Sequence, residues 1–136
     1  MFLKEHLLTG LVAATAVSWY VSPQAGISVL AGSVLIDVDH YLWYAVKFKD
    51  RSFRRAIRFF EAKESDHYYC LCVLHTVEVI AVYIAGVLFM HGAIFWISAG
   101  CLMHMMFDVA QGILDGGLLR RKWSLIHAIF FRARGG

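Results

Sequence analysis

The sequence predicts an all-α protein, an integral membrane four-helix bundle with one or two interfacial amphipathic helices. The first observation is composition: of 136 residues, 60% are hydrophobic and only 17% are charged, with a mean hydropathy of +0.61. Such a chain is too apolar for an ordinary soluble surface. The second is that the apolar residues fall into four segments, each long enough to cross or nearly cross a bilayer as a helix. We therefore expect residues 1–136 to form a single membrane-embedded domain.

The four expected transmembrane helices follow one another with short connections. They cover residues 5–21, 26–46, 67–90 and 93–112. The cluster Ser22–Gly26, which contains the single proline, separates the first helix from the second, and a His91-Gly92 turn separates the third from the fourth. The first segment is expected to stay as a helix and not to be cleaved as a signal peptide, because Glu5 offsets Lys4 and no small-x-small site precedes the proline.

A charged segment between the second and third helices, at about residues 50–64, is expected to lie in the headgroup plane. Apolar side chains recur there at helical spacing, at Phe53, Ile57 and Phe60. Arginines fill the other face, at Arg51, Arg54, Arg55 and Arg58. This pattern is typical of an interfacial amphipathic helix. A second interfacial helix is expected at about 123–132, a segment too short to span a bilayer.

Charge placement predicts the orientation of the chain. With four crossings, Lys4, the basic loop at 47–63 and the basic C-terminal segment fall on one side, whereas the two opposite turns carry no Lys or Arg. The positive-inside rule then places both termini in the cytoplasm, with the protein integral to the cell (inner) membrane. The net charge of +3 is modest, so an anionic membrane face is a better expected partner than nucleic acid. The odd number of cysteines, at Cys70, Cys72 and Cys101, indicates buried reduced thiols and no disulfide framework.

Ionisable residues interrupt these apolar segments at helical spacing. They are His6, Asp37, Asp39, His40, His75, Glu78, His104 and Asp108. Within a membrane such groups are costly unless they are paired, hydrated or metal-bound, and they indicate a functional site. Residues three or four positions apart point to one helix face, and the expected topology brings all of these residues to the same leaflet although their helices run in opposite directions. A polar clamp between helices is the structural alternative.

Mixed imidazole and carboxylate ligation suits zinc, with manganese or non-haem iron as alternatives. We expect one or two divalent ions, most favourably zinc, held by His6, Asp37, His40, His75, His104 and Asp108. A metal lowers the pKa of bound water towards ~7 and stabilises the attacking and leaving oxygens, which favours hydrolysis. Asp39 and Glu78 are the two candidates for the catalytic general base. Asp39 lies on a different helix face from Asp37, so it is also a candidate for an orienting residue or a second-metal ligand.

Four motifs in order resemble a known family. They are His6, then Gly32-Ser-Val-Leu-Ile-Asp-Val-Asp-His40, His75-Thr76 and Gly100-Cys-Leu-Met-His-Met-Met-Phe-Asp108. The chain is similar to the membrane-bound metal-dependent hydrolases of the YdjM-like family, also described as LexA-binding inner-membrane-associated hydrolases. It departs from the family pattern at Ile36, where proline is usual, and at Cys70-Leu71-Cys72, where a His-Arg-Gly lead-in is usual. The resemblance implies a membrane-bound, metal-dependent hydrolase.

The expected function is hydrolysis of a phosphoester or ester in a lipid or amphiphilic substrate at the cytoplasmic leaflet, with membrane lipids as partners. One alternative is a protein that transports or senses a metal ion or proton, although few polar residues continue towards the outer leaflet. Another is a catalytically inactive adaptor of the same fold. A haem carrier is disfavoured because carboxylates adjoin the histidines. The substrate, the number of metal ions and the oligomeric state stay open.

Overall fold

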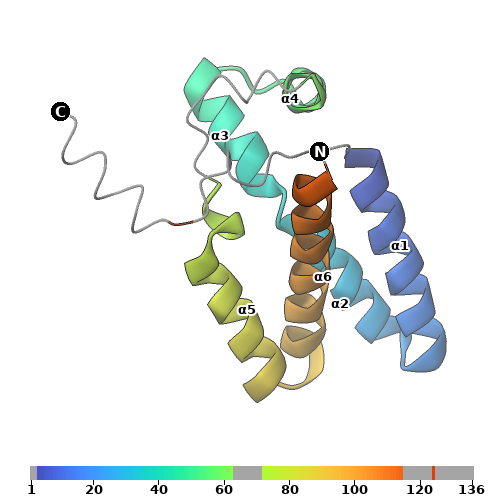
Figure 1. Cartoon of the computed structure of the whole chain (residues 1–136). Coiled ribbons are helices and arrows are strands. Elements are labelled where there is room, and N and C mark those ends of the chain that lie inside the picture. Colours follow the sequence, from blue (N-terminus) through green and yellow to red (C-terminus); the bar gives the residue numbers. More distant parts are fainter. Residues whose placement is uncertain (1–2, 63–71, 115–123, 125–136) are drawn as a thin grey trace.

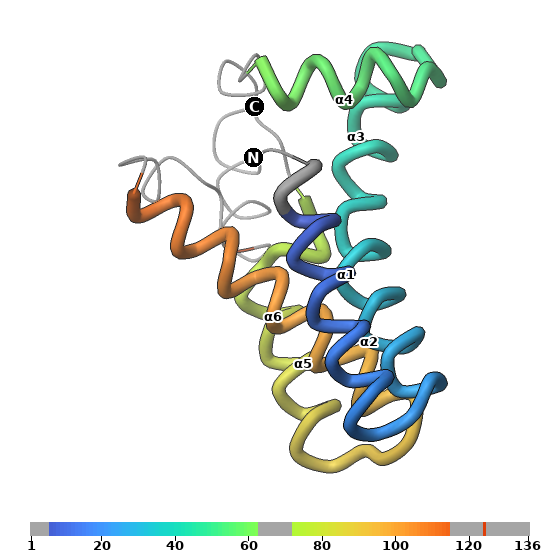
Figure 2. Tube along the Cα trace, turned by 90° about the vertical axis from the view of Figure 1, so that its right-hand side faces the viewer, coloured from blue at the N-terminus to red at the C-terminus, as the bar shows by residue number. Residues whose placement is uncertain are grey.

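The computed structural model describes residues 3–62, 72–114 and 124 (Figure 1). Its elements are α1 Leu3–Tyr20, α2 Pro23–Leu35, α3 Val38–Phe48, α4 Phe53–Glu61, the 3-10 turn η2 Val73–His75, α5 Val77–Phe89 and α6 Gly92–Leu114. The described part of the chain contains no strand, which confirms the all-α class. The main helix contacts are those of α2 with α6, of α1 with α2, and of α5 with α6. Helix α4 lies across one end of these helices, and the turns that join α1 to α2 and α5 to α6 lie at the opposite end (Figures 1 and 2).

The hairpin of α1 and α2 follows from the local sequence. Ser22 has an extended backbone, and its hydroxyl oxygen accepts a hydrogen bond of 3.2 Å from the N–H of Ala25. Pro23 occupies the first helical position, where its missing N–H has no intrahelical partner to lose. Serine is among the strongest N-cap residues, so the new helix begins here.

The segment expected as one helix at 26–46 is divided in the structure. Helix α2 ends at Leu35 and α3 begins at Val38, and Asp37 lies at the junction. The N–H of Asp37 donates to the carbonyl of Val34 and the N–H of His40 donates to that of Asp37, each at 3.2 Å. These are three-residue bonds of the 3-10 type, which tighten the chain locally. Hydrophobic periodicity did not predict the junction, because the residues on both sides are apolar.

The third expected helix, at 67–90, is shorter in the structure. Residues 67–71 lie outside the described part of the chain, and the helix α5 begins only at Val77. The extended Thr76 precedes it, and its carbonyl accepts the N–H groups of Val79 and Ile80. The 3-10 turn η2 therefore stands where a helical turn was expected, and it carries His75.

Two glycines allow α2 and α6 to pack closely. A side chain at Gly32 would collide with the backbone carbonyl of Ile97, and one at Gly100 would collide with the backbone carbonyl of Val29. Close approach of backbones through small residues is a common way for membrane helices to associate. This contact sets the position of α2, which leads into Asp37, relative to α6, which carries His104.

Of the segment 50–64, the structure forms a helix over Phe53–Glu61, α4, with the hydroxyl of Ser52 accepting from the N–H of Arg55. Its location in a headgroup plane stays a prediction. All four of its expected arginines are exposed. The apolar face differs from the expected one: Ala56 and Phe59 are buried, whereas Phe53 is 59% exposed. The ring of Phe59 packs 5.4 Å from that of Tyr44 on α3, and the small Ala56 allows this approach. Of the second expected interfacial helix, at 123–132, only Ser124 is described.

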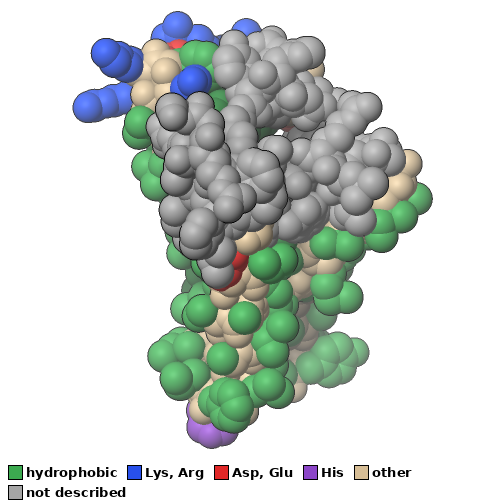
Figure 3. Space-filling view, turned by 60° about the vertical axis from the view of Figure 1, so that its left-hand side comes forward, with side chains coloured by type: hydrophobic (Ala, Val, Ile, Leu, Met, Phe, Trp, Pro, Cys, Tyr) green, Lys and Arg blue, Asp and Glu red, His purple; other side chains and the backbone are tan. Residues whose placement is uncertain are grey.

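Within the described residues, two helical stretches are long and apolar enough to cross a membrane, judged by length and composition: Pro23–Phe48 and Gly92–Leu114. Helix α5 is apolar but shorter. Large apolar side chains are exposed along the helices, and hydrophobic side chains cover much of the face in Figure 3 that lies below the Lys and Arg side chains. Contiguous apolar surface of this kind marks contact with a membrane or with another protein.

Candidate metal centre

Six of the expected site residues meet near the end of the helices over which α4 lies. They are His6 of α1, Asp37 at the α2–α3 junction, His40 of α3, His75 of η2, and His104 and Asp108 of α6. Elements that run in opposite directions thus bring their ionisable groups to one level, as the spacing in the sequence predicts. His6, His75, His104 and Asp108 are buried, and Asp37 and His40 are partly buried.

The inner group consists of His6, His104 and Asp108, whose candidate ligand atoms all lie within 4.8 Å of one another. The imidazole rings of His6 and His104 are stacked with their centroids 4.5 Å apart. Nε2 of His6 lies 3.1 Å from Oδ1 of Asp108. These three residues are 5%, 2% and 0% exposed, so bulk water does not solvate their polar atoms.

The outer group consists of Asp37, His40 and His75, whose candidate ligand atoms also lie within 4.8 Å of one another. Oδ1 of Asp37 lies 3.6 Å from Nδ1 of His40 and 3.6 Å from Nε2 of His75. The same oxygen lies 3.4 Å from Nε2 of His104 in the inner group. The carboxylate of Asp37 therefore reaches both groups.

Asp108 connects the groups from the other side. Its Oδ1 faces His6, and its Oδ2 lies 3.7 Å from Nε2 of His75. Carboxylates bind metals through either oxygen and commonly bridge two ions. The arrangement of Asp37 and Asp108 suits a pair of cations as well as a single one.

The polar atoms at the centre fit a cation better than they fit one another. Nε2 of His6, His75 and His104 and Oδ1 of Asp37 are buried, and none of these atoms has a hydrogen-bond partner among the described residues. Each unsatisfied buried polar atom costs about 1–3 kcal/mol. Nε2 of His75 and Nε2 of His104 lie 3.6 Å and 3.4 Å from Oδ1 of Asp37. These separations match those of ligands around one ion, because tetrahedral ligands at about 2.1 Å from zinc lie about 3.4 Å from one another. One cation beside Asp37 would satisfy the atoms of Asp37, His75 and His104, and a cation in the inner group would satisfy Nε2 of His6.

Two hydrogen bonds orient the imidazoles. Nδ1–H of His104 donates to the backbone carbonyl of Ser33 at 2.8 Å, which leaves the Nε2 lone pair facing Asp37. Nδ1 of His75 lies 3.3 Å from Oδ2 of Asp39, and the latter oxygen also accepts the N–H of Leu74 at 2.8 Å. Metal-binding histidines usually donate their other ring nitrogen to a carbonyl or carboxylate in this way.

The two expected general bases occupy different places. Asp39 adjoins the centre, with Oδ1 2.9 Å from Nδ1 of His40. Glu78, in the first turn of α5, accepts a hydrogen bond of 2.6 Å from the hydroxyl of Ser124 and belongs to none of the candidate ligand groups. Among the described residues, the candidate ligand groups therefore include Asp39 and do not include Glu78.

Two contributors were missed from the sequence. The carbonyl of Ser33 is a backbone group, so no residue pattern could have identified it. Cys72 forms a third candidate ligand group with Asp39 and His40. Its spacing from His75, Cys-x-x-His, is a signal in the sequence, although its apolar surroundings favour a buried reduced thiol.

No protein-family model matches the chain, and no curated protein or solved structure matches it either. The functional argument therefore depends on the geometry of the centre.

Proposed function

We propose that the chain is a membrane-bound, metal-dependent hydrolase whose centre holds one or two divalent cations. Zinc is the favoured ion, and manganese and iron are the alternatives. The ligands are His6, Asp37, His40, His75, His104 and Asp108. The observation that carries the proposal is the set of buried, unsatisfied imidazole and carboxylate atoms that face one another from separate helices. Structural polar clamps in membrane proteins normally pair such atoms through hydrogen bonds.

A divalent cation bound at this centre supplies an activated water molecule and neutralises charge on the substrate. The residues around it hold the imidazoles in the required orientation. Ser33 fixes His104 through its carbonyl, and Asp39 fixes His75 through Oδ2. Asp39 is also the better general base of the two candidates, because it adjoins the ligand groups whereas Glu78 contacts Ser124.

The proposed substrate is a phosphoester or ester of a lipid or amphiphile at the cytoplasmic leaflet. Two observations support this class. Apolar side chains are exposed along the helices, as expected for a lipid-facing surface. Helix α4, which carries exposed arginines, packs against the centre, since the ring of Phe60 on that helix lies 5.1 Å from the ring of His40. Arginine pairs well with phosphate and so favours an anionic headgroup.

This proposal includes location in the inner membrane with both termini in the cytoplasm, and membership of the YdjM-like family on its motifs. Transport of a metal ion or proton is less well supported, because the candidate ligand groups of the described residues all lie near α4 and involve none of the residues at the opposite turn, such as His91. An inactive adaptor with the same centre would bind metal without turnover, so assays of turnover separate it from an enzyme.

The first test is elemental analysis of detergent-purified, untagged protein. Wild type should contain near-stoichiometric zinc, manganese or iron, and His104→Ala should lose most of it. His91→Ala is the matched control, because His91 is exposed at the turn between α5 and α6 and belongs to no ligand group. Wild-type protein that binds no metal after reconstitution would exclude the hydrolase mechanism. Metal-loaded protein is then assayed on lipid phosphoesters.

A further inference from the structure

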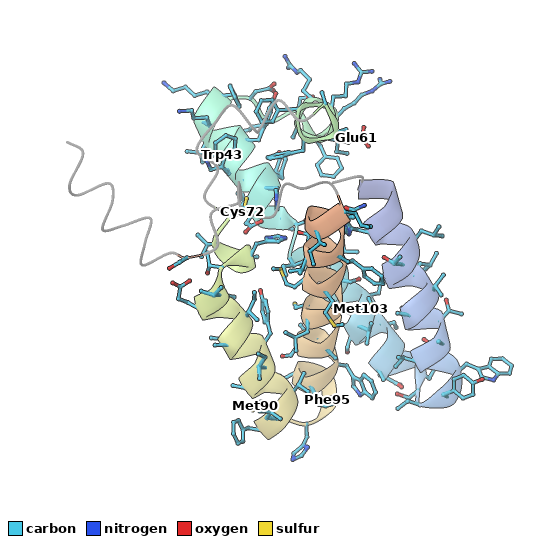
Figure 4. All side chains as sticks on the ribbon, in the orientation of Figure 1. Trp43, Glu61, Cys72, Met90, Phe95 and Met103 are labelled. Atoms are coloured by element: carbon cyan, nitrogen blue, oxygen red, sulfur yellow. The ribbon has the colours of Figure 1, made fainter. Side chains whose placement is uncertain are left out.

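Cys72 lies at the edge of the centre, at the residue that precedes η2 (Figure 4). It is partly buried, and its sulfur lies within 4.8 Å of candidate ligand atoms of Asp39 and His40. His40 also belongs to the outer group with Asp37 and His75. The imidazole of His40 thus belongs to two candidate ligand groups, one that contains the Cys72 thiol and one that does not. A cation bound by His40 would take its other ligands from one of these two groups.

Backbone contacts hold Cys72 against α3. Its carbonyl accepts the N–H of His75 at 3.1 Å, which closes the turn that carries both residues. The N–H of Leu74, within that turn, donates to Oδ2 of Asp39 at 2.8 Å. The turn is therefore fixed to the helix that supplies Asp39 and His40. The approach of the thiol to these two residues follows from this attachment.

Charge favours a fourth anion at a centre with two cations. Asp37, Asp39 and Asp108 supply three negative charges when ionised, and the imidazoles are neutral when they bind metal. Two divalent cations would leave a net charge of +1 in a poorly solvated site, where unbalanced charge is costly. A bound hydroxide or a thiolate supplies the missing charge, and Cys72 is the thiol within reach.

We propose that Cys72 is a thiolate ligand, together with His40, of the cation that lies on the α3 side of the centre, beside the carboxylate of Asp39. This inference rests on the proposed metal centre and deepens it by identifying one ligand and the preferred ion. The thiol releases its proton to solvent when the cation binds. Because thiolates are soft ligands, this position favours Zn²⁺ over Mn²⁺ or Mg²⁺.

X-ray absorption at the zinc edge of the zinc-loaded wild-type protein tests the inference without any substitution. A sulfur atom should be detected at about 2.3 Å from zinc, beside nitrogen and oxygen at about 2.0–2.1 Å. A shell of nitrogen and oxygen alone would overturn the assignment of Cys72. Wild-type protein that binds no zinc at all would overturn the proposed centre together with this inference.

Cobalt substitution then identifies which cysteine is the ligand. Cobalt-loaded wild type should show a thiolate-to-cobalt charge-transfer band in the near ultraviolet, and Cys72→Ser should lose it. Cys101→Ala is a control, because that buried thiol donates to the carbonyl of Gly32 at 3.4 Å. Cys70→Ser controls for the neighbouring cysteine. Loss of the band in either control but not in Cys72→Ser would contradict the inference, as would a band that persists in all three. Cys72→His should bind cobalt without the band, which separates loss of a sulfur ligand from loss of the fold.

Discussion

Nδ1–H of His104 on α6 donates a hydrogen bond of 2.8 Å to the backbone carbonyl of Ser33 on α2. In an unbroken helix that carbonyl would accept the N–H of Asp37, which here donates to Val34 instead. The junction between α2 and α3 therefore makes the Ser33 carbonyl available to the histidine. The junction between α2 and α3 thus places Asp37 in the centre and also fixes the orientation of His104 on α6.

Removal of metal should destabilise the wild-type protein more than it destabilises a ligand variant. A ligand that binds only the folded state stabilises it by about 4 kcal/mol when present at about 1,000 times its Kd. Chelator should therefore lower the Tm of wild type and of His91→Ala, whereas the decrease should be smaller for His104→Ala, which lacks one ligand. The measurement is thermal unfolding in detergent followed by circular dichroism. An equal response of His104→Ala and wild type would argue against metal binding by this residue.

Asp39→Asn should weaken metal binding without abolishing it. The amide keeps the shape of the side chain but removes the charge that orients His75, and loss of such a supporting contact typically lowers metal affinity by about 10- to 100-fold. Competition with a fluorescent chelator gives the affinity.

Glu78→Gln should leave metal affinity unchanged, because Glu78 contacts Ser124 and lies outside the ligand groups. Its effect on turnover then decides its catalytic role. A large decrease in kcat at full metal occupancy would identify Glu78 as the general base and contradict the preference for Asp39. An unchanged kcat supports that preference.

Gly100→Ala should destabilise the protein, although alanine is the better helix former by about 1 kcal/mol. The added methyl group would collide with the backbone carbonyl of Val29, and overpacking of this kind costs about 1–3 kcal/mol. Equilibrium unfolding in detergent measures the change. Ala85→Val, at an exposed position of α5, is the control that adds carbon atoms without a helix contact and should change stability little.

The orientation of the chain can be tested by thiol labelling from one side of the membrane. A cysteine at position 91, in the variant His91→Cys, should react with a membrane-impermeant reagent in intact cells, because this turn lies at the end opposite α4 (Figure 2). Arg54→Cys on α4 should react only after the cells are opened. The reverse pattern would mean that the centre faces the outer side.

The sequence alone was sufficient for the helical class, the hairpin at Ser22 and Pro23, the amphipathic helix α4 and six of the residues that meet at the centre, but not for Cys72. These properties depend on composition and on contacts within a few residues along the chain, which periodicity and capping rules describe. The convergence of His6, His75 and His104 could also be expected, because helices that alternate in direction return to the same level.

The tertiary structure decided how these residues are combined. Asp37 and Asp108 each lie between the two histidine groups, and the carbonyl of Ser33 contacts His104. Glu78 contacts Ser124 and belongs to none of the candidate ligand groups of the described residues. These relations depend on the register and spacing of helices that are far apart in the sequence. The approach of Cys72 to Asp39 depends on the hydrogen bond from the backbone N–H of Leu74 to the carboxylate of Asp39, which no local rule predicts. Local rules identify which groups a helix offers, and only packing determines which atoms of different helices come within ligand distance.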